Sequence, residues 1–140
     1  MNKELIINVT SNEITIALFE DKQLVELNKE KCKTGFAVGD IYLGKVKKIM
    51  PGLNAAFVNV GYEKDAFIHY LDLGPQFTTQ QKLVNILTNN KKIPNFETMR
   101  LDKAMGKNGK ISGFIASGQS ILVQIAKEAI STKGPRLTCD

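Results

Sequence analysis

Apolar and polar positions alternate most regularly between residues 41 and 70, where three strand-length runs are separated by short turns. In the second run, the small or branched side chains at positions 56, 58 and 60 fall on one face, which leaves Phe57 and Asn59 on the other. In the third run, positions 66, 68 and 70 share a face opposite Phe67 and His69. Because small and branched side chains suit a core, the pattern predicts a sheet that carries these four residues on its other face.

The register of this predicted hairpin decides which of the four side chains are neighbours. If residues 62–64 form the loop, Asn59 lies opposite Phe67 and Phe57 lies opposite His69. A shift of one residue would move them to different faces. Two aromatic rings and an imidazole on an open face form a platform on which nucleobases can stack. The alternative is that both phenylalanines belong to the core of a two-sided sheet, and the pattern alone leaves both interpretations open.

Three shorter apolar runs with polar turns between them occupy residues 4–31, which predicts a small antiparallel meander. Three short strands are marginally stable by themselves, so the meander needs a partner surface in this chain or in another. We therefore expect residues 1–34 to form the meander and residues 35–140 to form a second domain.

The first central strand carries a glycine and a group of lysines. Its alternation slips at Gly44, which suggests a bulge or a sharp bend of the kind that lets a small barrel curl. Lys45, Lys47 and Lys48 follow closely. They either form a solvated strand edge that discourages edge pairing or attract phosphates.

The strand pattern is interrupted between about residues 74 and 116. Thr78 and Gln81 have the spacing of a capping box, and the predicted helix ends at Asn89 and Asn90. Its apolar stripe consists of Leu83, Ile86 and Leu87. Residues 91–113 combine several Gly and Asn with basic residues, which predicts a mobile, solvated basic loop. Its basic residues are Lys91, Lys92, Arg100, Lys103, Lys107 and Lys110.

Strands resume at residues 121–125, and a basic turn at 131–136 leads into a strand that the chain hardly completes, so we expect a truncated form of a longer protein. Five strands, a glycine-bent first strand and a helix inserted before the fourth strand describe an OB-fold. The predicted fold class is therefore mainly β, with a five-stranded OB-fold barrel, an inserted short helix and loop, and the N-terminal meander.

Charge and composition exclude only a few classes of function. Nineteen Lys and Arg against fourteen Asp and Glu give a net charge of +5, which permits polyanion binding without requiring it. No apolar run reaches membrane-spanning length and no signal peptide is recognisable, so we expect a cytoplasmic protein with no membrane partner. His69 has no neighbouring nucleophile, and the aspartates show no paired metal-ligand pattern, so no catalytic or metal site is predicted.

Several blocks carry a more specific signal. Residues 41–46 read Ile-Tyr-Leu-Gly-Lys-Val, and residues 51–61 read Pro-Gly-Leu-Asn-Ala-Ala-Phe-Val-Asn-Val-Gly. Ala-Phe-Ile follows at 66–68, Gly-Gln-Ser-Ile-Leu-Val-Gln-Ile-Ala-Lys-Glu at 118–128, and Thr-Lys-Gly-Pro-Arg-Leu-Thr at 132–138. In this order the blocks resemble the RNA-binding module of the bacterial ribonuclease E/G family. Asn59 departs from the Asp that the family often has, and Ala66 from its Gly.

The resemblance implies a single-strand-specific endoribonuclease that acts in messenger RNA decay and ribosomal RNA maturation. It places the catalytic carboxylates beyond this chain, so we expect no cofactor here and magnesium in the full-length enzyme. It assigns base stacking to Phe57 and Phe67 and an RNA contact to Lys127, which reaches that face only if the strand ends or bulges near Ala126. The candidate RNA-binding residues are Phe57, Phe67, His69, Asn59, Lys45, Lys47 and Lys127.

The same resemblance makes single-stranded RNA and the rest of a parent ribonuclease chain the expected partners, and it allows a homo-oligomer of the full-length enzyme. In that family the meander belongs to a subdomain that later sequence completes. Two other functions remain open: a stand-alone OB-fold RNA-binding module, and a protein-interaction module whose aromatic face contacts another chain. Binding of RNA should weaken steeply with salt, whereas an apolar protein contact should not.

Overall fold

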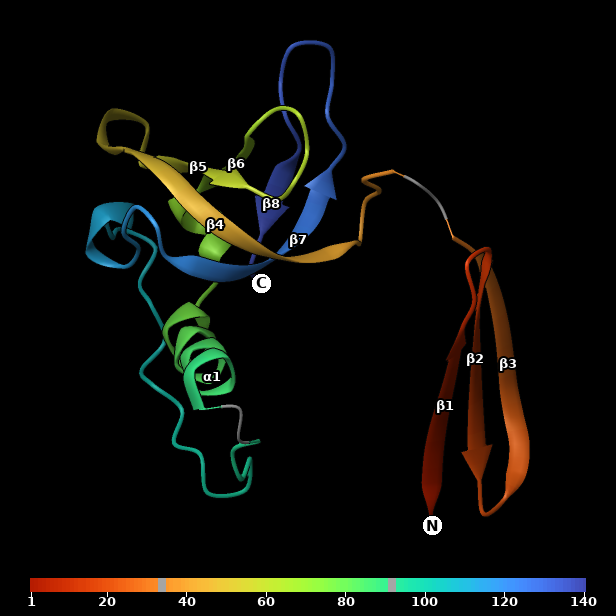
Figure 1. Cartoon of the computed structure of the whole chain (residues 1–140). Coiled ribbons are helices and arrows are strands. Elements are labelled where there is room, and N and C mark those ends of the chain that lie inside the picture. The colour runs from red at the N-terminus through yellow and green to blue at the C-terminus, as the bar shows by residue number, and fades with distance from the viewer. Residues whose placement is uncertain (33–34, 91–92) are drawn as a thin grey trace. The chain divides into compact units, whose positions relative to one another are not determined.

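The computed structural model describes residues 1–32, 35–90 and 93–140, and it divides the chain into two compact units, Met1–Gly35 and Phe36–Asp140 (Figure 1). The boundary expected at residues 34/35 falls partly outside the described residues. Lys91 and Lys92 of the predicted basic loop also lie outside them. The two units are described separately.

The first unit is the predicted meander. Its strands are β1 (Lys3–Val9), β2 (Glu13–Glu20) and β3 (Gln23–Lys31), paired antiparallel in the order β1-β2-β3. Asp21 and Lys22 form the turn between β2 and β3 with positive φ angles of 46° and 67°, as a tight hairpin turn requires. All of β1 and β3 is exposed within this structure, including Leu5, Ile6 and Val25. The sheet therefore has no core of its own.

The second unit is a closed five-stranded barrel, as predicted. Its strands are β4 (Ile41–Met50), β5 (Ala55–Asn59), β6 (Ala66–His69), β7 (Ser120–Lys127) and β8 (Arg136–Thr138). They follow the order β4-β5-β6-β8-β7, and antiparallel pairing of β4 with β7 closes the barrel. Only the β6–β8 pair is parallel among the described strand pairs. The prediction of a mainly β chain with a barrel, a short helix and a meander is confirmed.

The barrel interior holds the small and branched side chains that the alternation assigned to it. Ala56 and Val58 of β5 and Ala66 and Ile68 of β6 have no exposed surface. The other strands contribute Val46, Ile121, Val123, Ile125 and Leu137, each at most 1% exposed. Since the interior faces of all five strands are filled in this way, the outer faces are left for contacts with other molecules.

The predicted irregularity at Gly44 is wrong in position. Tyr42, Gly44 and Val46 all belong to the inner side of β4, while Ile41 and Leu43 are exposed. A β-carbon on Gly44 would lie 2.6 Å from Cγ1 of Val58, so the glycine is needed because the facing strand approaches closely. The register shift of β4 against β5 occurs between Val46 and Lys48 instead.

The helix α1 (Phe77–Asn90) begins one residue before the expected cap. Thr78 lies inside the helix and its hydroxyl has no partner among the described residues, so the predicted capping box is wrong. The buried residues of the helix are Phe77, Thr79, Gln81 and Val84, whereas Leu87 is 41% exposed. The Gln81 side-chain amide donates to the carbonyl of Ser120 at 2.9 Å, so the contact with β7 sets the face that the helix buries.

Three short 3-10 turns complete the unit: η1 (Pro51–Leu53), η2 (Tyr70–Leu73) and η3 (Ile111–Gly113). Asn54 follows η1 with a φ of 50°, and its side chain donates to the carbonyl of Gly109 and accepts from the amide of Ile111. The Tyr70 hydroxyl also donates to the carbonyl of Gly106. The last part of the expected mobile loop is therefore fastened to the barrel. None of the described helices is long and apolar enough to cross a membrane.

Candidate nucleic-acid interface

The rings of Phe57 and Phe67 lie side by side on the outer face of the barrel. β5 pairs with β6 so that Phe57 stands directly opposite Phe67, with ring centroids 6.1 Å apart and an interplanar angle of 67°. Both side chains are partly buried, in contrast to the fully buried positions on either side of them. The rings therefore keep some surface accessible to a ligand.

The register differs from the predicted one by two residues. β5 ends at Asn59 and β6 begins at Ala66, so the connection is longer than the predicted loop. The Asn59 side chain accepts the amide of Gly61, whose φ is 89°, and this local turn ends the strand early. Because a shift of two keeps every side chain on its face, the two rings still share one face, although their cross-strand partners changed.

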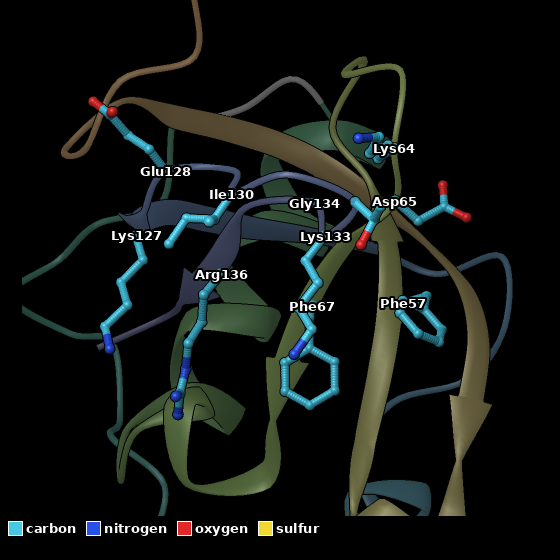
Figure 2. A pocket seen from close by; sticks show the side chains of 11 residues that line it. Phe57, Lys64, Asp65, Phe67, Lys127, Glu128, Ile130, Lys133, Gly134 and Arg136 are labelled. Carbon is cyan, nitrogen blue, oxygen red and sulfur yellow. The ribbon is translucent and has the colours of Figure 1, made fainter.

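A groove of about 730 Å³ opens beside the ring pair (Figure 2). Phe57 and Phe67 form one side of it, and the β7–β8 connection forms the other. Its remaining lining residues are Lys64, Asp65, Lys127, Glu128, Ile130, Thr132, Lys133, Gly134 and Arg136. The groove thus combines aromatic surface with polar and charged side chains.

Positive charge outweighs negative charge around the groove. Four basic residues line it, Lys64, Lys127, Lys133 and Arg136, against two acidic ones, Asp65 and Glu128. In Figure 2 the charged ends of Lys127, Lys133 and Arg136 point toward the same side as the Phe67 ring, whereas both carboxylates point away from it. An anion lying along the rings would therefore meet mainly cations.

The four basic groups are held to different degrees. The Arg136 guanidinium donates to both carboxylate oxygens of Asp72, at 3.2 and 3.1 Å, which fixes its plane. The Lys64 ammonium donates to the carbonyl of Ser131. Lys127 and Lys133 are exposed and make no ion pair within the described part of the chain. Two positions of the groove are thus preset, and two long side chains can adjust to a ligand.

Lys127 reaches this face through a bulge in β7. Its position would otherwise follow Ile121, Val123 and Ile125 into the interior. The pairing of β7 with β8 shifts between Ile125 and Lys127, so that Ile125 faces Leu137 in the core while Lys127 faces Arg136 outside. On the sequence alone, Lys127 reaches the outer face only if the strand ends or bulges near Ala126. The structure has such a bulge.

Close backbone contacts hold the β7–β8 connection against β6. The amide of Phe67 donates to the carbonyl of Pro135 at 2.9 Å. A β-carbon on Gly134 would lie 2.1 Å from the carbonyl oxygen of Asp65, so only glycine fits there without displacement. This contact brings the basic turn at residues 131–136 beside the rings.

Four of the candidate residues lie outside the groove. Lys45 of β4 lies opposite Asn59, the last residue of β5. Lys47 forms an ion pair with Asp65 at 3.0 Å. His69 lies opposite Ala55 and not opposite Phe57, which corrects the predicted neighbour. Its Nδ1 accepts the amide of Leu71 and caps η2, so this nitrogen has a structural partner. The structure brings together only Phe57, Phe67 and Lys127 of the candidates.

Lys64, Lys133 and Arg136 were missed as groove residues. For Lys133 and Arg136 the sequence signal was the basic composition of the turn at 131–136, and for Lys64 there was none. The turn at 131–136 lies beside Phe67 because β6 and β8 pair in parallel, with Phe67 opposite Arg136. Local alternation carries no information about such a distant pair.

Comparison with known proteins identifies relatives along nearly the whole chain. Ribonuclease G of Haemophilus influenzae is 37% identical over 137 residues, which cover 98% of this chain and 24% of the relative. Ribonuclease G of Escherichia coli is 32% identical over 144 residues, covering all of this chain and 25% of the relative. Ribonuclease E of Nostoc is 38% identical over 124 residues, or 87% of this chain and 14% of that protein. The chain belongs to the ribonuclease E/G family.

This ribonuclease E/G chain corresponds to the N-terminal region of the family and spans about a quarter of the length of its ribonuclease G relatives. No family model matches it. The comparisons support the family origin, and the ring pair and the basic groove belong to that region.

The magnesium implied for ribonuclease E/G enzymes finds no ligand set among the described residues. No group of three or more His, Cys, Asp or Glu side chains is arranged there to hold a metal ion. Asp65, which lines the groove, and Asp72, the partner of Arg136, are each paired with a basic side chain instead. The residues present do not fit the metal, so no chemical step is derived for this region.

Proposed function

We propose that the barrel unit is the part of a ribonuclease E/G enzyme that holds single-stranded RNA. The observation that carries the proposal is the partly accessible Phe57–Phe67 pair at the edge of a groove with an excess of basic residues. Base faces are available for stacking when RNA is unpaired, and aromatic side chains bind them with little dependence on sequence.

The geometry supports one base stacked flat on a ring rather than two bases stacked in parallel. An interplanar angle of 67° means that the rings cannot present parallel faces to neighbouring bases. A base on one ring would contact the second ring by its edge, which is a favourable aromatic arrangement. Lys127 and Lys133 would then contact phosphates next to that base, since both line the same groove.

The chemistry of the whole enzyme is part of the same proposal. The resemblance supports a magnesium-dependent endoribonuclease of single strands that acts in RNA decay and ribosomal RNA maturation. We assign the cleavage machinery to sequence outside these 140 residues, because the described residues offer no metal-ligand cluster. The chain should accordingly bind a labelled single strand in the presence of magnesium and release no shortened product.

Fluorescence anisotropy with a labelled single-stranded oligonucleotide tests the binding role. Two to four phosphate contacts should give a plot of log affinity against log salt with a slope between about −1.4 and −2.8. An RNA duplex of the same length should bind more weakly, since its bases are not free to stack.

A double variant provides the matched control for this measurement. Lys127→Gln combined with Lys133→Gln should make the slope shallower by about 1.4, because two adjustable phosphate contacts are lost. Binding that is indifferent to salt, or equally strong for duplex and single strand, would contradict the proposal. The first of these outcomes is the one expected of a protein-interaction surface.

A further inference from the structure

The register across the barrel places a further lysine next to the rings, on the side away from the groove. Lys48 of β4 lies directly opposite Phe57 of β5. Phe57 faces Phe67, Phe67 faces Arg136, and Arg136 faces Lys127. These residues form one row across all five strands: Lys48, Phe57, Phe67, Arg136 and Lys127. We call it the cross-barrel row.

A bulge in β4 determines which way Lys48 points. Val46 lies opposite Val58, and both side chains are buried inside the barrel. Strict alternation after Val46 would turn Lys48 inward as well. The extra residue, Lys47, shifts the phase, so that Lys48 pairs with Phe57 on the outer face and is exposed.

The bulge is held by hydrogen bonds from another segment of the chain. The Ser117 hydroxyl donates to the carbonyl of Lys47 at 2.7 Å. The amide of Gly118 donates to the carbonyl of Val46 at 2.7 Å. Bulges are common beside binding sites because they redirect a side chain in this way. The bulge in β7 acts likewise on Lys127, so each end of the cross-barrel row has a lysine that alternation alone would have buried.

The two lysines at the bulge have different surroundings. Lys47 is paired with Asp65, with its ammonium 3.0 Å from both carboxylate oxygens. Lys48 makes no ion pair or side-chain hydrogen bond in the described ranges 1–32, 35–90 and 93–140. An exposed, uncompensated cation beside an aromatic ring that can stack a base is well placed to contact the phosphate next to that base.

We propose that Lys48 binds a backbone phosphate of single-stranded RNA on the side of Phe57 opposite the groove. The RNA then crosses the barrel along the cross-barrel row, over both rings, with basic side chains at both ends. Neighbouring strands lie about 4.8 Å apart, so the row covers about 19 Å measured along the curved outer surface of the closed barrel. This inference rests on the proposed RNA-binding function and adds a contact and a path to it.

The test is the salt dependence of RNA binding by Lys48→Gln in the 140-residue chain, with a labelled oligouridylate of about ten nucleotides as the probe. Loss of one phosphate contact should make the slope of log affinity against log salt shallower by about 0.7. The dissociation constant should then rise by about eightfold at 50 mM salt and by about threefold at 200 mM. Lys48→Arg keeps the charge and should restore the parent slope.

Lys103→Gln is the matched control. It removes the same charge from an exposed residue that follows Asp102, the partner of Lys82 on α1, and that lies outside the cross-barrel row. It should leave the slope unchanged. Lys48 is exposed, so Lys48→Gln should melt at the parent temperature, which circular dichroism can verify.

The possible failures are distinguishable. If Phe67→Ala weakens binding while Lys48→Gln leaves both affinity and slope as in the parent, RNA binding stands and the path along the cross-barrel row is overturned. The path is likewise overturned if Lys103→Gln lowers the slope as much as Lys48→Gln, because the effect is then one of net charge. If the parent chain binds no oligonucleotide at any salt concentration, both the function and the inference are overturned.

Discussion

Replacing Phe67 by alanine should separate affinity from stability. A base stacked on an aromatic ring contributes about 1–3 kcal/mol, so Phe67→Ala should raise the dissociation constant for single-stranded RNA by about 5- to 150-fold. A fully buried phenylalanine costs about 3–5 kcal/mol when it becomes alanine. Phe67 is only partly buried, and its pairing with Phe57 contributes about 0.5–1.5 kcal/mol, so we expect a loss of about 2 kcal/mol.

Both quantities can be measured on the same protein, by fluorescence anisotropy for affinity and by urea denaturation for the free energy of unfolding. Phe36→Ala is the matched control, because Phe36 is also partly buried and packs against Tyr42 and Tyr62 at centroid distances of 5.0 and 5.1 Å. It does not line the groove, so it should lose comparable stability and keep its affinity. A Phe67→Ala protein that melts far lower, yet binds RNA as the parent does while folded, would refute the stacking role.

Two further substitutions and the chemistry of the two cysteines test the surroundings of the site. Asn54→Gly keeps the positive φ but removes both side-chain hydrogen bonds, so it should cost about 1–3 kcal/mol in urea denaturation and speed exchange of the Ile111 amide at the start of η3. Gly134→Ala should displace the β7–β8 connection and weaken RNA binding in anisotropy, whereas an alanine at an unobstructed glycine should not. Burial, and secondarily a nearby aspartate, raises the pKa of Cys139 from 9.0 to about 12, so at pH 8 a thiol reagent should modify exposed Cys32 quickly and the partly buried Cys139 far more slowly. Because the unfolded chain ionises first, stability should be unaffected by Cys139 below about pH 9 and should fall as the pH rises toward about 12.

Alternation along single strands predicted the faces of the barrel but not the contacts between strands. Phe57 and Phe67 share a face because every second side chain of a strand does, and this needs no knowledge of the partner. Their direct pairing depends on where β5 ends, which the turn at Asn59 decides. The register error of two residues left both rings on one face, but it displaced His69 from Phe57 and Asn59 from Phe67.

The strand bulges and the buried face of α1 could not be predicted from local alternation, because each depends on a contact between segments that are distant in sequence. Ser117 stabilises the bulge at Lys47 from 70 residues away in sequence. The face that α1 buries follows from the bond between Gln81 and β7, and not from the stripe of larger apolar residues. The prediction of mobility stays a prediction for residues 93–101.

Parallel pairing of β6 with β8 has a consequence for how the protein is made. Residues of β8 are added about 70 positions after those of β6, and β7 only shortly before them. At ~5–20 residues per second, roughly 4–14 seconds of synthesis separate the two strands. During most of that interval β4, β5 and β6 can pair with one another, but β7 and β8 are not yet there to cover their inner side chains. The many long-range contacts of the barrel also favour slow folding. A nascent chain arrested before β7 should therefore remain sensitive to protease and available to chaperones, with no stable half-barrel on the way to the native fold.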